Sequence, residues 1–210
     1  NETTLHWGNT PVSIKLQTEF PWINAYSLEV DQVPEGGMDL LLRVPDYAKD
    51  YQVRVSEVNG TVRMVTEVTE VTEKGYCRVH LDEAAQVQVT FAAPAKFVYA
   101  NPQVRADSGK TAIVRGPLVY CLEEIDNGEN LPAIFVDTDV PLTEEPSNLF
   151  GGIVTVKAKG KKIVESSVSD SLYGGEKPEL QDVDLTLIPY PYWNNQGEGE
   201  MLVWMKELHP

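Results

Sequence analysis

The side chains in this sequence that could do acid–base chemistry are, above all, its carboxylates. Two carboxyl groups about 5–10 Å apart can share acid and base roles, as they do in glycoside hydrolysis. Glu123 and Glu124 are adjacent in an apolar stretch, so in a strand their side chains would point to opposite faces. Glu198 and Glu200 could share one face at the rim of a sugar site, but the glycines around them favour a solvated hairpin turn. The sequence therefore marks out no catalytic pair.

Nucleophilic chemistry would need a cysteine or serine beside a base. Two of the three histidines, His6 and His209, lie near the ends of the chain, and His80 is three residues from Cys77. At that spacing a strand would place Cys77 and His80 on opposite faces. Cys77 and Cys121 both sit in apolar strand patterns, which favours buried free thiols. No Cys/His cluster has metal-ligand spacing, so we predict neither a catalytic residue nor a metal ligand.

One loop carries side chains suited to binding. Tyr190 lies between two prolines, and Tyr192 and Trp193 follow the second of them, ahead of Asn194 and Asn195. Flat rings beside amides suit stacking on a sugar and hydrogen bonding to its hydroxyls. The alternative, which the sequence favours, is that the rings pack against a neighbouring domain. These five residues are the candidate contact site, for carbohydrate or for another domain.

Composition narrows the classes of partner. The formal net charge is −15, from 32 acidic and 17 basic residues, so a nucleic acid would be repelled. The one basic cluster, at positions 157–162 around Gly160, is typical of a solvated hairpin tip. No apolar run approaches the ~18 residues of a membrane span, so we expect no membrane partner. The first ten residues lack the basic and apolar regions of a signal peptide, and the compartment (periplasmic, secreted or cytoplasmic) stays open.

The fold class follows from the period of apolar residues. Apolar and polar residues alternate over most of the chain, with glycine and proline in the breaks, and this pattern predicts short strands. The predicted strands are 12–17, 25–30, 38–44, 52–58, 76–81, 87–91, 111–115, 118–123, 133–136, 152–158, 162–168, 183–188 and 201–206. We expect an all-β protein of two β-sandwich-like (jelly-roll type), mostly antiparallel domains, 1–105 and 106–210. The VTE repeat at 65–73 does not keep its valines on one face, and we assign it no function.

Four stretches carry a family resemblance. Residues 101–124, NPQVRADSGKTAIVRGPLVYCLEE, and 187–204, LIPYPYWNNQGEGEMLVW, resemble the C-terminal part of glycoside hydrolase family 127, the β-L-arabinofuranosidase-type enzymes. The TEFPWINAY run at 18–26 and the LRVPDYA run at 42–48 are similar to the middle domain of that family. The resemblance extends over essentially the whole chain and is strongest in the first two stretches.

The resemblance implies that the chemistry lies outside this chain. Family members carry a helical (α/α)6 barrel in which a glutamate and cysteines bind zinc and a cysteine is the nucleophile. The Glu-x-Cys and Cys-Cys elements of that site do not occur in these 210 residues, so no catalytic or zinc-binding role passes to any residue here. In particular, Cys121 matches a β-domain strand. The implied role is a non-catalytic C-terminal portion that supports the barrel or mediates dimerisation.

The partners implied are the missing N-terminal catalytic domain, a second copy in a homodimer, and a plant-type saccharide. Two other functions fit the same residues. One is an independent carbohydrate-binding module, and the other is a structural or assembly domain. The sugar specificity of the parent protein stays open, because specificity resides in the catalytic domain.

Overall fold

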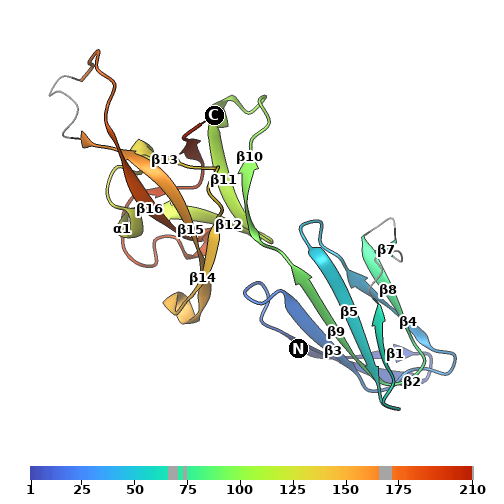
Figure 1. Ribbon diagram of the computed structural model, residues 1–210. Coiled ribbons are helices and arrows are strands. Elements are labelled where there is room, and N and C mark those ends of the chain that lie inside the picture. The colour runs from blue at the N-terminus through green and yellow to red at the C-terminus, as the bar shows by residue number, and fades with distance from the viewer. Residues whose placement is uncertain (66–70, 73–74, 166–171, 210) are drawn as a thin grey trace. The chain divides into compact units, whose positions relative to one another are not determined.

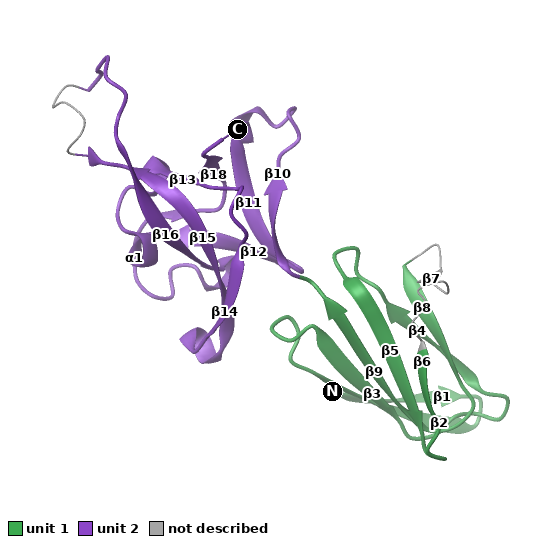
Figure 2. Ribbon diagram, in the orientation of Figure 1, with its two compact units in different colours: residues 1–93 green, residues 94–210 purple. Residues whose placement is uncertain are grey.

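The protein, seen in a computed structural model that describes residues 1–65, 71–72, 75–165 and 172–209, consists mostly of β-strands. It forms two compact units, Asn1–Ala93 and Pro94–Pro210 (Figure 1, Figure 2). The strand pairs of the described residues are antiparallel with one exception, and the predicted all-β, mostly antiparallel class is confirmed. No helix among the described residues is long and apolar enough to cross a bilayer.

Unit 1 is built from two sheets. The six-stranded sheet has the order β1-β2-β3-β9-β5-β6, and the three-stranded sheet has the order β4-β8-β7. The strands are β1 (Glu2–Trp7), β2 (Thr10–Thr18), β3 (Ala25–Val30), β4 (Met38–Arg43), β5 (Lys49–Glu57), β6 (Val62–Val65), β7 (Val71–Thr72), β8 (Tyr76–Leu81) and β9 (Ala85–Ala92). In β4, β5, β8 and β9 buried and exposed residues alternate, so each strand turns one apolar row toward the core.

The core of unit 1 lies between these apolar rows. It contains Val53 and Val55 of β5, Val87 and Val89 of β9, and Leu81 of β8, none of them more than 1% exposed. Burying such rows between two sheets is what stabilises a sandwich.

Unit 2 is one sheet that closes on itself. The pairings run β11-β18-β13-β15-β16-β12, and β12 pairs back to β11 through Val114↔Val119 and Arg115↔Leu118. The strands are β10 (Ala95–Tyr99), β11 (Lys110–Arg115), β12 (Leu118–Glu123), β13 (Ile134–Val136), β14 (Thr143–Ser147), β15 (Ile153–Ile163), β16 (Leu180–Pro189), β17 (Met201–Leu202) and β18 (Met205–Glu207). Short helical turns follow the strands: η2 (Arg105–Asp107), α1 (Glu124–Asn127), η3 (Leu131–Ala133), η4 (Leu149–Gly151) and η6 (Tyr190–Tyr192).

The closed sheet surrounds its own core. Tyr120, Leu122, Ile134 and Leu187 are almost completely buried there. The Tyr120 hydroxyl reaches this depth because it donates to the Val154 carbonyl at 2.8 Å, and burial raises the pKa of Tyr120 to about 12.

The division between the units lies earlier than the predicted boundary near 105. Strand β10 pairs with β11 from Ala95↔Arg115 to Tyr99↔Thr111, so it belongs to unit 2. Residues 100–109 are therefore the loop of a hairpin and contain η2, although their turn-rich sequence is also typical of a linker. The chain passes between the units at Ala93 and Pro94.

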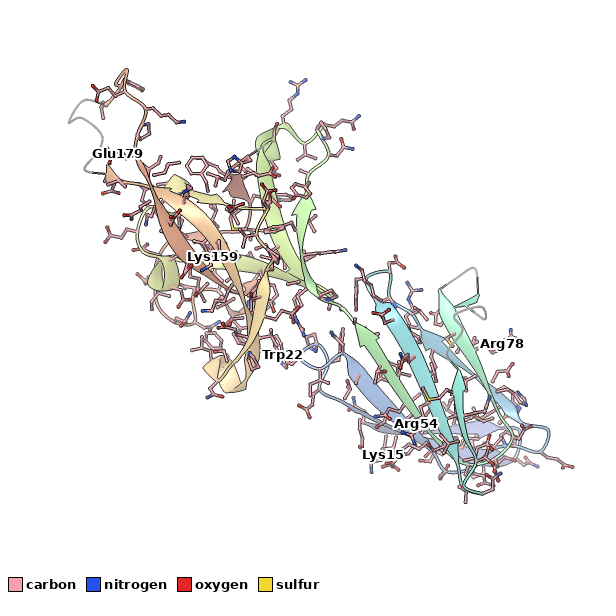
Figure 3. The ribbon with its side chains drawn as sticks, viewed as in Figure 1. Lys15, Trp22, Arg54, Arg78, Lys159 and Glu179 are labelled. Carbon is pink, nitrogen blue, oxygen red and sulfur yellow. The ribbon has the colours of Figure 1, made fainter. Side chains whose placement is uncertain are left out.

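The basic cluster is not a hairpin tip. Strand β15 runs unbroken through Gly160, which lies opposite Val136 on one side and Val183 on the other. A Cβ at this position would clash with the Phe135 carbonyl oxygen, so glycine serves here for close strand packing and not for a turn. Two lysines of the cluster pair with acids of β16: Lys161 with Asp182 at 2.6 Å, and Lys159, labelled in Figure 3, with Asp184 at 2.5 Å.

Two predictions fall partly on residues that the structure does not describe. Of the VTE repeat at 65–73, residues 66–70 and 73 lie outside the described ranges. The same holds for residues 166–168 of the strand predicted at 162–168.

Candidate functional site

The aromatic loop lies at the end of β16 in unit 2. The rings of Tyr190 and Trp193 are nearly parallel, with centroids 6.2 Å apart and an interplanar angle of 17°. Both remain open to solvent, with exposed fractions of 44% and 41%. We call this pair the Tyr190–Trp193 shelf. Two accessible rings this close together offer apolar area against which another ring or an apolar side chain can pack.

A second loop supports the first. Phe150 of η4 stacks on Tyr192 with centroids 4.8 Å apart and an angle of 7°. Register explains the contact: Val156 of β15 pairs with Leu187 of β16, so the start of β15 lies beside the end of β16. Sequence reasoning missed Phe150, whose only signal was an aromatic ring before two glycines.

Backbone and side-chain polar groups of the aromatic loop hydrogen-bond inside the chain. The backbone N–H of Asn194, at a φ of 63°, donates to Glu123 Oε1 at 2.7 Å. Gln196 Nε2 donates to Glu123 Oε2 and to Asp126 Oδ2, both at 3.0 Å. Asn195 Nδ2 donates to the Tyr192 carbonyl at 3.0 Å. These groups therefore fix the shape of the loop, while the rings remain accessible.

The acidic residues near the loop hold it in place. Glu123 at the end of β12 is only 4% exposed, and its carboxylate accepts the two loop donors already described. Glu124 Oε2 accepts the Glu200 N–H at 2.8 Å, and Glu200 Oε2 accepts the Leu131 N–H at 2.6 Å. Glu200 is therefore engaged with the backbone of η3, and these contacts give it a structural role.

Both cysteines are free and buried, as predicted. Burial, with a smaller contribution from the nearby Glu123 charge, raises the pKa of Cys121 to about 12. A thiol with that pKa stays protonated near neutral pH and is a poor nucleophile or metal ligand. Over the part of the chain that the structure describes, no group of three or more His, Cys, Asp or Glu side chains could hold a metal ion.

His80 lies on the exposed face of β8, opposite to Cys77, as the strand period predicted. Its Nδ1 is 2.7 Å from Asp39 Oδ1 and its Nε2 is 3.3 Å from Asp82 Oδ1. The hydrogen bond to Asp39 is the main cause that raises the pKa of His80. The group is a hydrogen-bonded surface cluster, and its imidazole is not beside a thiol.

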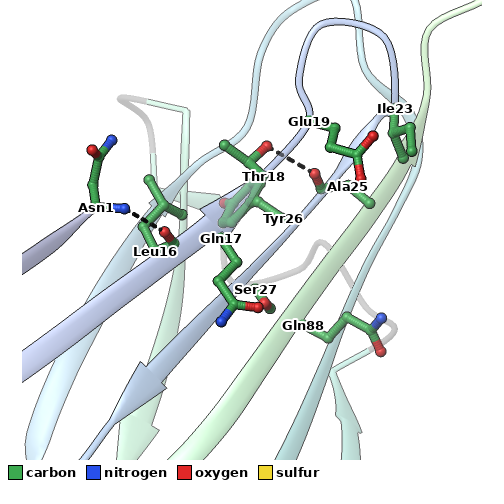
Figure 4. Close-up of a pocket in the computed structure, with 10 residues that line it drawn as sticks. All are labelled: Asn1, Leu16, Gln17, Thr18, Glu19, Ile23, Ala25, Tyr26, Ser27 and Gln88. Carbon is green, nitrogen blue, oxygen red and sulfur yellow. Dashed lines mark hydrogen bonds between the residues drawn. The ribbon is translucent and has the colours of Figure 1, made fainter.

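Unit 1 has a polar hollow of about 560 Å³ at one end of its larger sheet (Figure 4). Gln17 pairs with Ser27 and Ser27 with Gln88, so three adjacent strands place an amide, a hydroxyl and an amide in one row. In the sequence these polar residues appear only as the alternate positions of predicted strands. That pattern is the same for an ordinary solvated sheet face, so it did not predict the hollow.

An apolar pocket of about 290 Å³ lies nearby in unit 1. Its walls include Phe20 and Tyr26 of the 18–26 motif, Tyr47 of the 42–48 motif, and Phe91. The two motifs thus meet in space, and the Tyr26 and Tyr51 hydroxyls hydrogen-bond at 3.1 Å beneath them.

Comparison with known proteins fits this two-part architecture. Residues 1–95 match the middle domain of the GH127 beta-L-arabinofuranosidases, and residues 95–206 match the glycoside hydrolase family 127 C-terminal domain. The chain belongs to glycoside hydrolase family 127. The resemblance drawn from the sequence motifs is confirmed.

Relatives of the GH127 chain are considerably longer. The non-reducing end beta-L-arabinofuranosidase of Bifidobacterium longum subsp. longum is 26% identical over 206 residues, which are 93% of this chain and 30% of that protein. A GH127 beta-L-arabinofuranosidase from Geobacillus stearothermophilus T6 superimposes with a TM-score of 0.85 at 34% identity, over 98% of this chain and 32% of that one. A further GH127 beta-arabinofuranosidase gives a TM-score of 0.79 at 27% identity, over 98% and 33% of the two chains. The chain thus spans about a third of the length of these relatives.

Proposed function

We propose that this chain is the non-catalytic, β-rich portion of a GH127 glycoside hydrolase and that it supports the catalytic barrel. The observation that carries the proposal is coverage: a middle domain and a C-terminal domain account for residues 1–206, yet the relatives are about three times as long. The catalytic residues and the zinc site then belong to the remaining portion of the parent protein.

The chemistry of the described residues supports this role. The Cys121 thiol is buried and has a raised pKa, and the best-placed carboxylates, Glu123 and Glu200, accept hydrogen bonds from the loop and from η3. A nucleophile needs access to its substrate and an activating base, and neither cysteine has that access.

Assay of the isolated chain tests the proposal. With aryl β-L-arabinofuranosides, in the presence and absence of zinc, we expect no turnover above the buffer rate. Robust turnover by the isolated chain would overturn it. A companion measurement compares the thermal unfolding of the parent protein with that of a version lacking these 210 residues. Support of the barrel predicts a lower unfolding temperature for the shortened protein, and an unchanged temperature would count against it.

A second candidate function is carbohydrate binding at the Tyr190–Trp193 shelf. The observation that favours it is the accessible pair of parallel rings, because sugars pack their apolar faces on aromatic rings. Titration with plant-type arabinosides, followed by tryptophan fluorescence, tests this function. A saturable response that Trp193→Ala removes and Tyr173→Ala preserves would favour it, since Tyr173 is an equally aromatic but separate surface residue. The absence of any response would leave packing as the role of the shelf.

A further inference from the structure

The core-facing side of the six-stranded sheet continues past the core onto β1. Residues directly opposite each other in an antiparallel pair lie on the same face. Leu5 is opposite Val12, which is 1% exposed and part of the core. Trp7 is two residues further along β1 and so lies on the same face as Leu5. Both side chains therefore point to the side of the sheet that is buried elsewhere.

These two residues are nevertheless exposed. Leu5 is 50% exposed and Trp7 is 60% exposed, and all six residues of β1 are solvent-accessible. Within the described residues the opposing sheet has three strands, β4, β8 and β7, against six. The buried core of unit 1 takes residues from β2 onward and none from β1. The apolar face thus extends beyond the sheet that covers it.

An exposed apolar surface of this kind is unusual on an edge strand that nothing covers. Among the strands that the structure describes, β1 pairs only with β2 and forms one edge of its sheet. Exposed edges are commonly protected by charges or prolines, but the sequence of β1, ETTLHW, carries one carboxylate and no lysine, arginine or proline. A tryptophan and a leucine side by side on the core-facing side of an edge strand are typical of a surface that another element covers.

We propose that this face of β1, defined by Leu5 and Trp7, is the docking surface for the portion of the parent GH127 protein that lies outside this chain. The inference rests on the proposed function and names the surface through which the support acts. Two observations select this occupant. The first is that the chain matches a middle and a C-terminal domain and covers 30% of its relative, so in the family another portion precedes the middle domain, whose first strand here is β1.

The second observation concerns charge. A second copy of this chain would bring together two bodies that each carry a formal charge of −15, which opposes association. The Leu5–Trp7 face itself is neutral and apolar, so it fits an apolar surface whose burial removes both side chains from water.

Hydrogen exchange tests the inference, with the isolated chain compared to the full-length parent protein. We expect the backbone amides of residues 2–7 to exchange at least tenfold more slowly in the parent. In the parent, the double variant Leu5→Thr/Trp7→Thr should return exchange to the rate of the isolated chain. Threonine suits a strand, and both replaced side chains are exposed, so circular dichroism should show an unchanged fold.

The matched control is Val62→Thr/Met64→Thr on β6, the opposite edge of the same sheet. Val62 and Met64 are exposed to a similar degree, 51% and 49%, but lie opposite Ser56 and Arg54 on the solvent face. This variant should leave exchange in β1 of the parent unchanged.

Three outcomes would overturn the inference. Equal exchange of β1 in the parent and in the isolated chain would show that nothing covers the strand. Persistence of the slow exchange in the Leu5→Thr/Trp7→Thr parent would place the contact elsewhere. Protection in the isolated chain that grows with protein concentration would make the occupant a second copy. If the shortened parent is destabilised while β1 is unprotected, the proposed function stands and only this surface is wrong.

Discussion

Glu123 accepts the backbone N–H of Asn194 at 2.7 Å, across a separation of 71 residues. This one contact joins the end of β12 to the aromatic loop after β16, and Gln196 Nε2 donates to the other oxygen of the same carboxylate at 3.0 Å. The carboxylate is almost completely buried. The Tyr190–Trp193 shelf therefore owes its shape to an acid that the sequence presents as one of two neighbouring glutamates.

Glu123→Ala should destabilise unit 2 and loosen the aromatic loop. The change leaves the Asn194 N–H without its acceptor and removes one of the two acceptors of the Gln196 amide, which keeps Asp126. Loss of hydrogen bonds to a charged group costs about 1.5–3 kcal/mol. Urea unfolding measures the loss of unfolding free energy. Glu129→Ala, a nearby surface change, is the control and should stay within about 0.5 kcal/mol of the unmodified chain. Equal stabilities for the two variants would refute the role of Glu123.

Gly160→Ala should destabilise the closed sheet of unit 2. The added methyl group meets the Phe135 carbonyl oxygen and lies 3.0 Å from the Leu185 side chain, and overpacking of this kind costs about 1–3 kcal/mol. Gly175→Ala provides the comparison, because its Cβ would meet nothing within 4 Å. Thermal unfolding should show a lower midpoint for the first variant only. A hairpin tip at Gly160 would instead tolerate both changes alike.

Glu144→Ala should destabilise unit 2 much more than Glu145→Ala. Glu144 Oε2 accepts Arg115 Nε at 2.7 Å and its Oε1 accepts the Ala95 N–H at 2.7 Å. Breaking a fully buried pair costs about 3–5 kcal/mol, and because the Glu144 side chain is 31% exposed we expect about 2 kcal/mol. Glu145 pairs with Lys157 at the surface, 3.8 Å away, where a pair contributes about 0–1 kcal/mol. Urea midpoints distinguish the two variants, and similar shifts would contradict the prediction.

Both cysteines should resist thiol reagents in the folded protein. Cys121 is fully buried with a pKa raised to about 12, and Cys77 is buried in the core of unit 1. A disulfide reagent at pH 8 should modify neither thiol until urea is added, after which both react, because reaction needs an accessible thiolate. Rapid labelling of Cys121 in the native chain would show that its strand opens or that the thiol is not buried.

His80 should titrate above its unfolded pKa of 6.5, mainly because of its hydrogen bond to Asp39. A raised folded pKa means that the His80–Asp39 pair contributes stability fully below the unfolded pKa. That contribution is lost as the pH rises through the folded pKa. NMR titration of the imidazole should give a lower pKa in Asp39→Asn than in the unmodified chain. The control is Asp46→Asn, which changes a more exposed acid of the same unit and should leave the pKa of His80 unchanged. If Asp39→Asn also left that pKa unchanged, the hydrogen bond to Asp39 would not be the cause of the raised pKa.

Local periodicity was enough for much of the fold. The strands at 25–30, 76–81 and 118–123 were predicted with the bounds that the structure shows. Alternation marks 76–81, where every second residue is buried, and a short apolar run marks 118–123, which is buried continuously from Tyr120 onward. Strands were missed or given the wrong bounds where no regular apolar row marks them in the sequence. Gly160 interrupts the pattern of β15 without ending the strand, and β1 has no buried row at all.

Only part of the candidate site could be predicted from the sequence. The aromatic loop could be singled out because rings and amides cluster within a few residues, and the structure places this segment directly after β16. Its partners Glu123 and Phe150 are about 70 and 40 residues away, and their contacts depend on strand register, which no local pattern specifies. Whether the aromatic loop binds sugar or packs against another domain stays a prediction.

By itself the sequence determined the all-β class and membership of family 127, because strand period and motif residues are local properties of the chain. Tertiary structure decided how the sheets close, where the units divide and which apolar side chains stay uncovered. Leu5 and Trp7 illustrate the difference: their alternation in β1 is visible in the sequence, but their exposure depends on how many strands the opposing sheet supplies. That number results from hydrogen bonding between segments far apart in the chain, so only the folded protein reveals the open face of β1.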